Sequence, residues 1–326
     1  MKIIGTINPY SINNEIVDIF KKYKVDIIRI NGAHIYYNDL TILLKEIEKK
    51  FDYNYKLLLD IPGNKIRIVN LLEPIVLSRN QEFCIFFEQL NYPQITNYIK
   101  KGDIILSNDG LYKFEIIEIN KNKINLLSHS DGKLTNGKGL HFQIKSNKSI
   151  NIRIPFLFEK DKILIEYAIK NRIDYIGVSY VRSVENINEI KKILGRKKTQ
   201  PIIKIETKEA YNNLEEIIKN SDIINIDRGD LSSEIGIINI SKAQEKIIKI
   251  AKKYNKEVFL ATQFFYYMIE HPIPLISEID AFYYVLKQNI SGIQLSDETV
   301  KGKYIENILK IIRELSYQQE LGNEEK

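Results

Sequence analysis

The sequence predicts an α/β protein: a closed (β/α)8 TIM barrel with an inserted small all-β lid domain. Short apolar runs rich in β-branched residues recur along the chain, and each is followed by a polar turn and an amphipathic helical stretch. One long segment interrupts this rhythm and alternates apolar and polar residues with period two. The recurring runs and helical stretches are typical of parallel strands joined by crossover helices, and the alternating segment is typical of an antiparallel insertion.

Eight apolar runs are expected to form the barrel strands, because eight strands with intervening helices fit a closed barrel better than an open doubly wound sheet. In chain order these runs cover Ile3 to Ile7, Val25 to Ile30, Lys56 to Asp60, Tyr175 to Ser179, Ile202 to Glu206, Ile223 to Asp227, Val258 to Thr262 and Gly292 to Leu295. Active sites of such barrels lie at the carboxyl ends of the strands, so polar residues there are the candidates for function.

The alternating segment defines the expected domain organisation. It contains turn signals such as Ser130-Asp131-Gly132, which favour hairpins. We expect a first part of the barrel at residues 1–68, the β lid at 69–153, the second part of the barrel at 154–316, and a charged tail at 317–326. A long insertion on a barrel loop is well suited to cover the catalytic face.

Composition limits the class of partner. The 326 residues are 44% hydrophobic, and 48 Lys and Arg face 42 Asp and Glu in dispersed positions, so the net charge of +6 suits anionic metabolites without requiring nucleic acid. The single cysteine, Cys84, cannot build a disulfide framework or a thiolate metal cluster. The chain shows neither a signal peptide nor an apolar stretch long enough for a bilayer, so we expect a cytoplasmic protein without a membrane partner.

Charged residues gather at the predicted strand ends. Alternation along the fifth run would aim Lys204 and Glu206 to the same side. Glu206 and Asp230 offer oxygen ligands for Mg²⁺, and Arg29, Arg67 and Lys204 would surround a phosphoryl group. From the residues alone, a phosphoryl-handling site and ordinary salt bridges at the barrel mouth both remain open.

Motif order adds a family resemblance over nearly the whole chain up to about Ser316. The segments that carry it are IIGTINPYS, IIRINGAH, LLLDIPGNKIRI, IIKIETKEA, IDRGDLSSEIG, ATQFFYYMIEHPIP and LSDETVKGKY. In order and spacing they resemble the pyruvate kinases, in a form that lacks the C-terminal regulatory domain of that family. The resemblance implies transfer of the phosphoryl group of phosphoenolpyruvate to ADP, which gives pyruvate and ATP.

The resemblance also implies roles for single residues. Lys204, Thr262 and Arg29 match catalytic positions, at which the lysine stabilises the phosphoryl group in flight and the threonine stands beside the enolate carbon. The substrate-binding positions match Arg29, Lys204, Gly229, Asp230 and Thr262. Glu206 and Asp230 match ligands of Mg²⁺ or Mn²⁺, and Arg67 and Lys138 match residues near the nucleotide.

A further set of positions concerns the binding of monovalent cations. Family members commonly bind K⁺ through an asparagine, a serine and an aspartate, and the matching positions here are Asn31, Ala33 and Asp60. The serine hydroxyl is thus missing, and Lys65 stands where K⁺-dependent members commonly carry glutamate. We expect the Lys65 ammonium to supply the positive charge, so that K⁺ is not required.

Other departures leave two alternatives open. Asp227 replaces a small residue beside the expected substrate carboxylate, and bulky aromatic residues fill positions 264–267. These changes favour a phosphotransferase acting on a different enol phosphate or acceptor; a catalytically idle scaffold is the remaining alternative. Leu275 and Ile276 replace residues at a usual interface between barrels, which leaves a homodimer open as the assembly.

Overall fold

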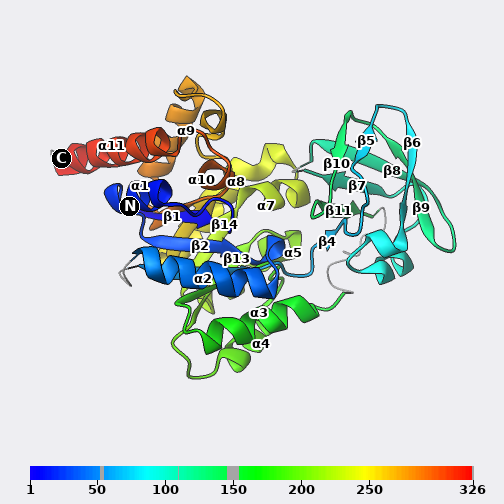
Figure 1. The fold of residues 1–326 in the computed structure, drawn as a ribbon, viewed down its shortest axis with the longest axis horizontal. Helices are drawn as coiled ribbons and strands as arrows, with labels where there is room; N and C mark the ends of the chain where they lie inside the picture. Colours follow the sequence, from blue (N-terminus) through cyan, green and yellow to red (C-terminus); the bar gives the residue numbers. More distant parts are fainter. Residues whose placement is uncertain (52–54, 109, 145–153, 325–326) are drawn as a thin grey trace.

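The computed structural model describes residues 1–51, 55–108, 110–144 and 154–324, with side chains described up to Leu321. The predicted lid end at 153 and the tail residues 325–326 lie outside the described residues. Figure 1 shows the barrel and the lid side by side, with both chain termini on the side of the barrel away from the lid. None of the described helices is both long enough and apolar enough to cross a membrane.

The eight predicted runs form one closed barrel of parallel strands. The order around the barrel is β1-β16-β15-β14-β13-β12-β3-β2. The strands span β1 (Lys2–Ile7), β2 (Ile27–Asn31), β3 (Lys56–Ile61), β12 (Tyr175–Val178), β13 (Gln200–Ile205), β14 (Ile223–Asp227), β15 (Glu257–Ala261) and β16 (Gly292–Leu295). The predicted fold class is therefore confirmed, and each run differs from its strand by at most two residues at either end.

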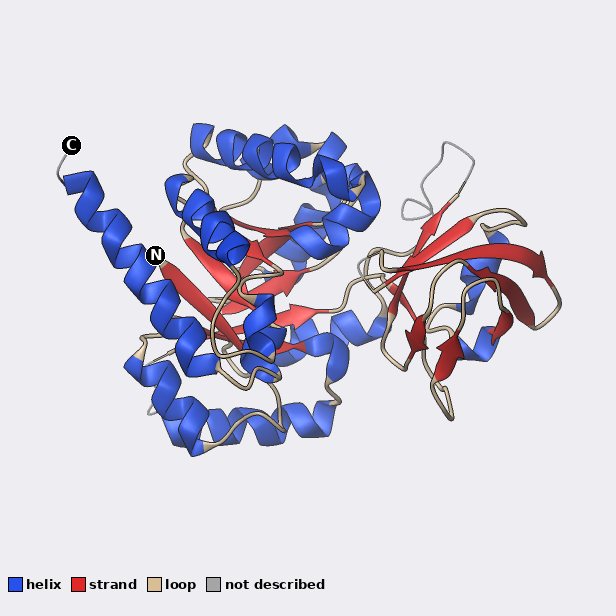
Figure 2. Cartoon of the chain, turned by 90° about the horizontal axis from the view of Figure 1, so that it is seen from above, coloured by secondary structure: helices blue, strands red, loops and turns tan. Residues whose placement is uncertain are grey.

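Helices surround the barrel, as Figure 2 shows from above. They span α1 (Asn14–Lys22), α2 (Tyr37–Phe51), α3 (Glu159–Lys170), α4 (Val184–Leu194), α5 (Lys208–Asn212), α6 (Leu214–Lys219), α7 (Arg228–Ile235), α8 (Ile240–Lys253), α9 (Ile276–Lys287), α10 (Asp297–Val300) and α11 (Ile305–Glu324). Short 3-10 turns are η1 (Gly32–His34), η2 (Phe87–Gln89), η3 (Pro93–Asn97), η5 (Ile237–Asn239) and η6 (Tyr266–Ile269). The last helix continues past Ser316, where the tail was predicted to begin.

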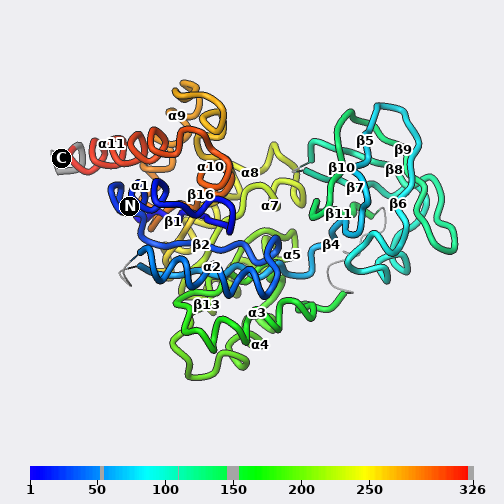
Figure 3. Tube along the Cα trace, viewed as in Figure 1, coloured from blue at the N-terminus to red at the C-terminus, as the bar shows by residue number. Residues whose placement is uncertain are grey.

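The lid has its own antiparallel sheets and its own apolar core. Its strands are β4 (Ile66–Arg67), β5 (Ile75–Leu77), β6 (Glu82–Phe86), β7 (Ile104–Ser107), β8 (Tyr112–Ile119), β9 (Lys123–Ser128), β10 (Gly132–Leu134) and β11 (Gly139–Gln143). Six of them pair in the order β4-β11-β7-β8-β9-β6, while β10 pairs with β5. Figure 3 traces the chain from the barrel into the lid through β4. The domain boundaries themselves remain a prediction.

Side chains inside the barrel form an apolar layer below a polar layer. The apolar cluster contains Ile4, Ile27, Leu58, Ile202, Ile223 and Phe259. Two residues further along five of these strands stand buried polar residues, namely Thr6, Arg29, Asp60, Lys204 and Asn225. Because strand side chains alternate with period two, each polar residue points to the same side as the apolar residue before it. The polar layer therefore lies nearer the carboxyl ends of the strands.

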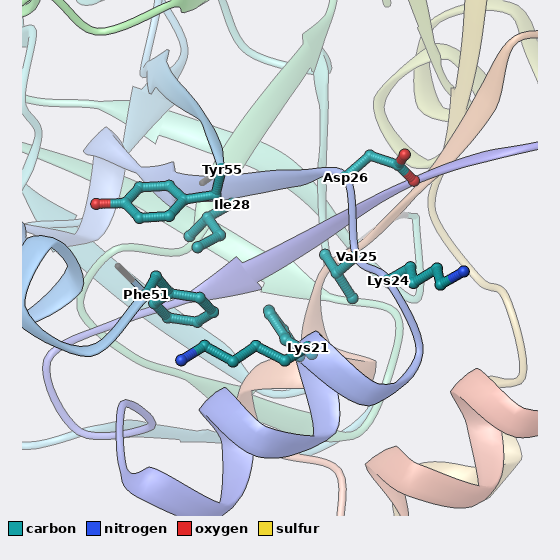
Figure 4. A pocket seen from close by; sticks show the side chains of 8 residues that line it. Lys21, Lys24, Val25, Asp26, Ile28, Phe51 and Tyr55 are labelled. Carbon is teal, nitrogen blue, oxygen red and sulfur yellow. The ribbon is translucent and has the colours of Figure 1, made fainter. Parts of the chain in front are cut away.

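A cavity of about 540 Å³ lies near the amino ends of the strands, away from the polar layer, between α1 and α2. Lys21, Phe51 and Tyr55 are among the residues that line it (Figure 4). These residues belong to helices or precede strands, so this cavity is separate from the polar layer at the carboxyl ends.

Candidate active site

A cavity of about 210 Å³ opens above the polar layer of the barrel. It is bordered by residues from seven barrel strand ends or the turns after them, and from the start of the lid. The predicted site residues that line it are Arg29, Asn31, Asp60, Lys65, Arg67, Lys204, Asp230 and Thr262, and Asp227 lines it too. The fold thus brings most of the predicted residues together, although they are spread over more than 230 positions of the sequence.

The second and third strands contribute a buried ion pair. Arg29 donates from Nε to Asp60 Oδ2 at 2.6 Å, and its Nη2 lies 2.6 Å from the same oxygen. Arg29 Nη1 also donates to Thr6 Oγ1 at 2.9 Å, and both members of the pair are buried. The other oxygen of Asp60 packs against Gly177, where a Cβ atom would collide with it. Asp60 is therefore fixed tightly, and it fixes the Arg29 guanidinium in turn.

Lys204 stands at the centre of the charged cluster. Its Nζ lies 2.9 Å from Glu206 Oε2 and 3.1 Å from Asp227 Oδ2, and it donates to Ser179 Oγ at 3.4 Å. Burial opposes the charge of this lysine, but Glu206 and Asp227 raise its pKa above the ordinary value. Lys204 is therefore a cation in the folded protein, and it pairs with Glu206, which alternation along the strand was expected to aim to the same side.

Three carboxylates meet beside this lysine. Glu206, Asp227 and Asp230 each offer an oxygen within 4.8 Å of the others. Burial raises the pKa of Glu206 to about 7 against the opposing charge of Lys204. For Asp230, burial acts in the same direction, but Lys65 and His141 hold its pKa well below the usual range. Hard oxygen ligands at this spacing fit a divalent cation such as Mg²⁺ or Mn²⁺.

The lid reaches the same carboxylate cluster. Lys65, which directly precedes β4, forms an ion pair with Asp230 Oδ1. His141, on β11, places Nε2 3.1 Å from that oxygen and Nδ1 3.4 Å from Glu234 Oε1. Burial and Lys65 lower the pKa of His141, but the bonds to Asp230 and Glu234 raise it above its ordinary value. Lys65 thus lines the same cavity as Asn31 and Asp60, but its ammonium is paired with Asp230.

The segment after β15 holds a strained backbone. Thr262 has a φ of 79° and Gln263 a φ of 58°, and a β-branched residue rarely adopts such values. Arg228 binds the carbonyl oxygens of Ala261, Thr262 and Gln263. The Thr262 hydroxyl donates to Asp227 Oδ1 at 2.7 Å. Strain of this kind costs about 1–3 kcal/mol and persists where neighbours enforce it, as is common at functional sites.

Two groups of predicted residues lie elsewhere. Lys138 is on the lid, where its Nζ donates to Asn108 Oδ1 at 2.5 Å, and it does not line the cavity. Phe264 and Phe265 are buried and pack against Phe282, whereas the next two tyrosines are exposed. The two phenylalanines are therefore packing residues, and the aromatic segment does not line the cavity.

The sequence reasoning missed His141 and Tyr180. Tyr180 lines the cavity, donates its backbone N–H to Glu206 Oε1 at 2.7 Å, and has a φ of 59°. Its position directly after the predicted strand at Ser179 was an available signal. His141 is one of only four histidines, three positions after Lys138, but only the folded lid brings it to Asp230.

Comparison with known proteins decides the family. A family model described as pyruvate kinase, barrel domain, matches residues 1–309. The chain belongs to the pyruvate kinase family. A pyruvate kinase from Thermotoga maritima is 28% identical over 98% of this chain and 71% of its own length. One from Borreliella burgdorferi is 29% identical over 97% and 67%, and plastidial pyruvate kinase 2 from Arabidopsis thaliana is 28% identical over 93% and 54%.

The matched residues include every residue that lines the candidate active site. The match covers every barrel strand, and it includes the lid between β3 and β12. The chain spans between 54% and 71% of the length of the three pyruvate kinases named above.

Proposed function

We propose that this chain transfers the phosphoryl group of phosphoenolpyruvate to ADP and yields pyruvate and ATP. The observation that supports this most strongly is the cavity itself, which gathers Arg29, Arg67 and Lys204 around a cluster of carboxylates at the barrel mouth. Phosphoryl transfer needs little covalent chemistry from the protein, and it depends on positioned positive charge. Membership of the pyruvate kinase family supports the same reaction class.

Each charged group has a distinct part in the proposed reaction. Arg29 and Lys204 are held by carboxylates, so they are oriented before the substrate binds and need no reorganisation during the transfer. Glu206 and Asp230 would hold Mg²⁺, which when bound polarises the phosphoryl oxygens and offsets their charge. Arg67 borders the cavity on the lid side, where the nucleotide phosphates would enter.

The lid completes the site in this proposal. Contacts of Lys65 and His141 with Asp230 bring the lid onto the barrel mouth. A covered site excludes water, which would otherwise accept the phosphoryl group in place of ADP. Lys138 would have to leave Asn108 in order to reach a nucleotide phosphate.

Transfer from a different enol phosphate, or to a different acceptor, is the second candidate. Asp227 favours it, because this carboxylate lines the cavity and accepts the Thr262 hydroxyl that a substrate could otherwise use. The aromatic segment at 264–267 lends no support, since it lies away from the cavity. Phosphoenolpyruvate therefore remains the first substrate to test.

An assay with phosphoenolpyruvate, ADP and Mg²⁺, coupled to lactate dehydrogenase, tests the proposal directly. We expect turnover in the unmodified protein and a loss of at least about 100-fold in kcat for Lys204→Met. Lys208→Met is the matched control, since Lys208 is an exposed lysine four positions away. Absence of both pyruvate and ATP formation by the unmodified protein would reject phosphoenolpyruvate as the substrate.

A further inference from the structure

Asp227 is placed to act together with the two carboxylates that the family resemblance assigns to the metal. It ends β14, while Asp230 lies in the first turn of the following helix α7 and Glu206 follows β13. The three side chains offer oxygens within 4.8 Å of one another. Oxygens on opposite sides of one Mg²⁺ lie about 4.2 Å apart, since each is about 2.1 Å from the ion. Small side-chain movements would therefore bring all three onto a single cation.

Glu206 provides independent evidence that this cluster is built for a ligand. The residue is fully buried, and its Oε1 accepts the Tyr180 N–H at 2.7 Å. Its Oε2 is fully enclosed, and the only donor that the described residues place against it is the Lys204 ammonium, at 2.9 Å. This single donor is shared with Asp227, so the oxygen keeps a lone pair for a cation. Lys204 also contacts Asp227 Oδ2, so both oxygens are turned toward the same region.

Charge explains why a third carboxylate is needed in this chain. Two ammonium groups touch the cluster, because Lys204 pairs with Glu206 and Lys65 pairs with Asp230. With only two carboxylates these charges would cancel, and little attraction for a cation would remain. With Asp227, three carboxylates stand against these two ammonium groups. Its contacts with Thr262 and Lys204 still leave lone pairs, since a carboxylate offers about four acceptor sites.

We propose that Asp227 is a third protein ligand of the divalent metal, beside Glu206 and Asp230. It thereby replaces one water in the octahedral shell of the ion and offsets the charge of Lys65. The proposal rests on the metal site of the proposed function, and it does not depend on which substrate the protein uses.

Mn²⁺ binding, followed by electron paramagnetic resonance without substrate or nucleotide, tests the proposal. We expect Asp227→Asn, which keeps the shape and an oxygen for Thr262, to weaken Mn²⁺ binding by at least about 10-fold. Glu234→Gln is the matched control: it removes a carboxylate that contacts His141 outside the cluster, and it should change the affinity by less than about threefold.

Counting the waters on bound Mn²⁺, by line broadening in ¹⁷O-labelled water, separates direct ligation from a charge effect. The unmodified protein should hold about three waters on the ion, and Asp227→Ala should add one. Weaker binding without a change in the water count would overturn the proposal, as would Asp227→Asn affinity within about threefold of the unmodified protein. If a variant fails to fold, the water count on the unmodified protein still tests the proposal, because a count clearly above three would overturn it. Normal Mn²⁺ binding without turnover of phosphoenolpyruvate would reject the proposed function alone.

Discussion

The stability of the Asp161→Asn variant, compared with that of the unmodified protein, should increase as the pH rises. Asp161 lies in the first turn of α3 and is fully buried. Its Oδ1 accepts the Gly63 N–H at 2.9 Å, and its Oδ2 accepts the Phe158 N–H at 2.8 Å. Gly63 precedes the lid and Phe158 follows it, so one carboxylate fastens both connections between the lid and the barrel.

The size of the effect follows from the pKa of this carboxyl group. Burial raises the pKa of Asp161 from 3.8 to about 6, although the two backbone N–H groups act in the opposite direction. A difference of about 2.2 pKa units corresponds to about 3 kcal/mol. Since the folded state holds the proton more tightly, this stability is fully present below pH 3.8 and is lost as the pH rises through about 6. Asparagine does not titrate, so the variant escapes the loss.

Urea unfolding of both proteins with EDTA, at about pH 4.5, 6 and 8, measures this difference. A constant cost of about 1–3 kcal/mol is expected for the variant, because the amide nitrogen faces one of the two N–H donors. On top of it, the free energy of unfolding of the variant relative to the unmodified protein should rise by about 2 kcal/mol from the lowest pH to the highest, because part of the effect is already lost at pH 4.5. Parallel pH curves would refute the reasoning. Glu159→Gln, an exposed site two positions away, is the control.

Three further predictions concern the charged cluster. Lys204→Met should lower the free energy of unfolding by about 3–5 kcal/mol in urea titrations, because it removes the cation that pairs with buried Glu206 and partly buried Asp227; a loss below about 1 kcal/mol would contradict this. Gly177→Ala should cost about 1–3 kcal/mol and raise the KM for the phosphorylated substrate, since its Cβ displaces Asp60; an unchanged KM would show that Asp60 is not needed. Rates in K⁺ and in tetramethylammonium at equal ionic strength should agree within about twofold, because Ala33 offers no side-chain oxygen and the Lys65 ammonium already lies at the same cavity. Strong activation by K⁺ alone would exclude this account.

The barrel could be predicted because its sequence signals are local. Each strand is a short apolar run with β-branched residues, and alternation fixes which residues face inward. The same rule predicted that Lys204 and Glu206 point to one side of the strand. The buried polar residues inside the barrel follow the same alternation, two positions after the residues of the apolar layer. Contacts between neighbouring strands then follow from their pairing, which sets Arg29 on β2 against Asp60 on β3 although 31 positions separate them.

Contacts between the lid and the barrel could not be predicted in this way. They depend on how two separately folded cores meet, and no pattern along the chain records that geometry. Lys65 was expected to serve the region of Asn31 and Asp60, and its ion pair with Asp230 emerges only from the fold. His141 gave no signal of its own, since a single polar residue in an alternating run such as β11 predicts no function, and only the fold shows that it is buried.

Asp230 connects the charged cluster of the barrel with the lid. Lys65 stands where the chain enters the lid and His141 stands on its last strand, and both contact the same oxygen, Oδ1, of Asp230. One carboxylate thus receives two contacts from the lid, while the cluster with Glu206 and Asp227 uses it as a potential metal ligand. Because a carboxylate has about four acceptor sites, the lid contacts and a cation can share it. A divalent ion bound there would face Lys65 and His141 across Asp230, so closure of the lid and binding of the metal must each alter the free energy of the other.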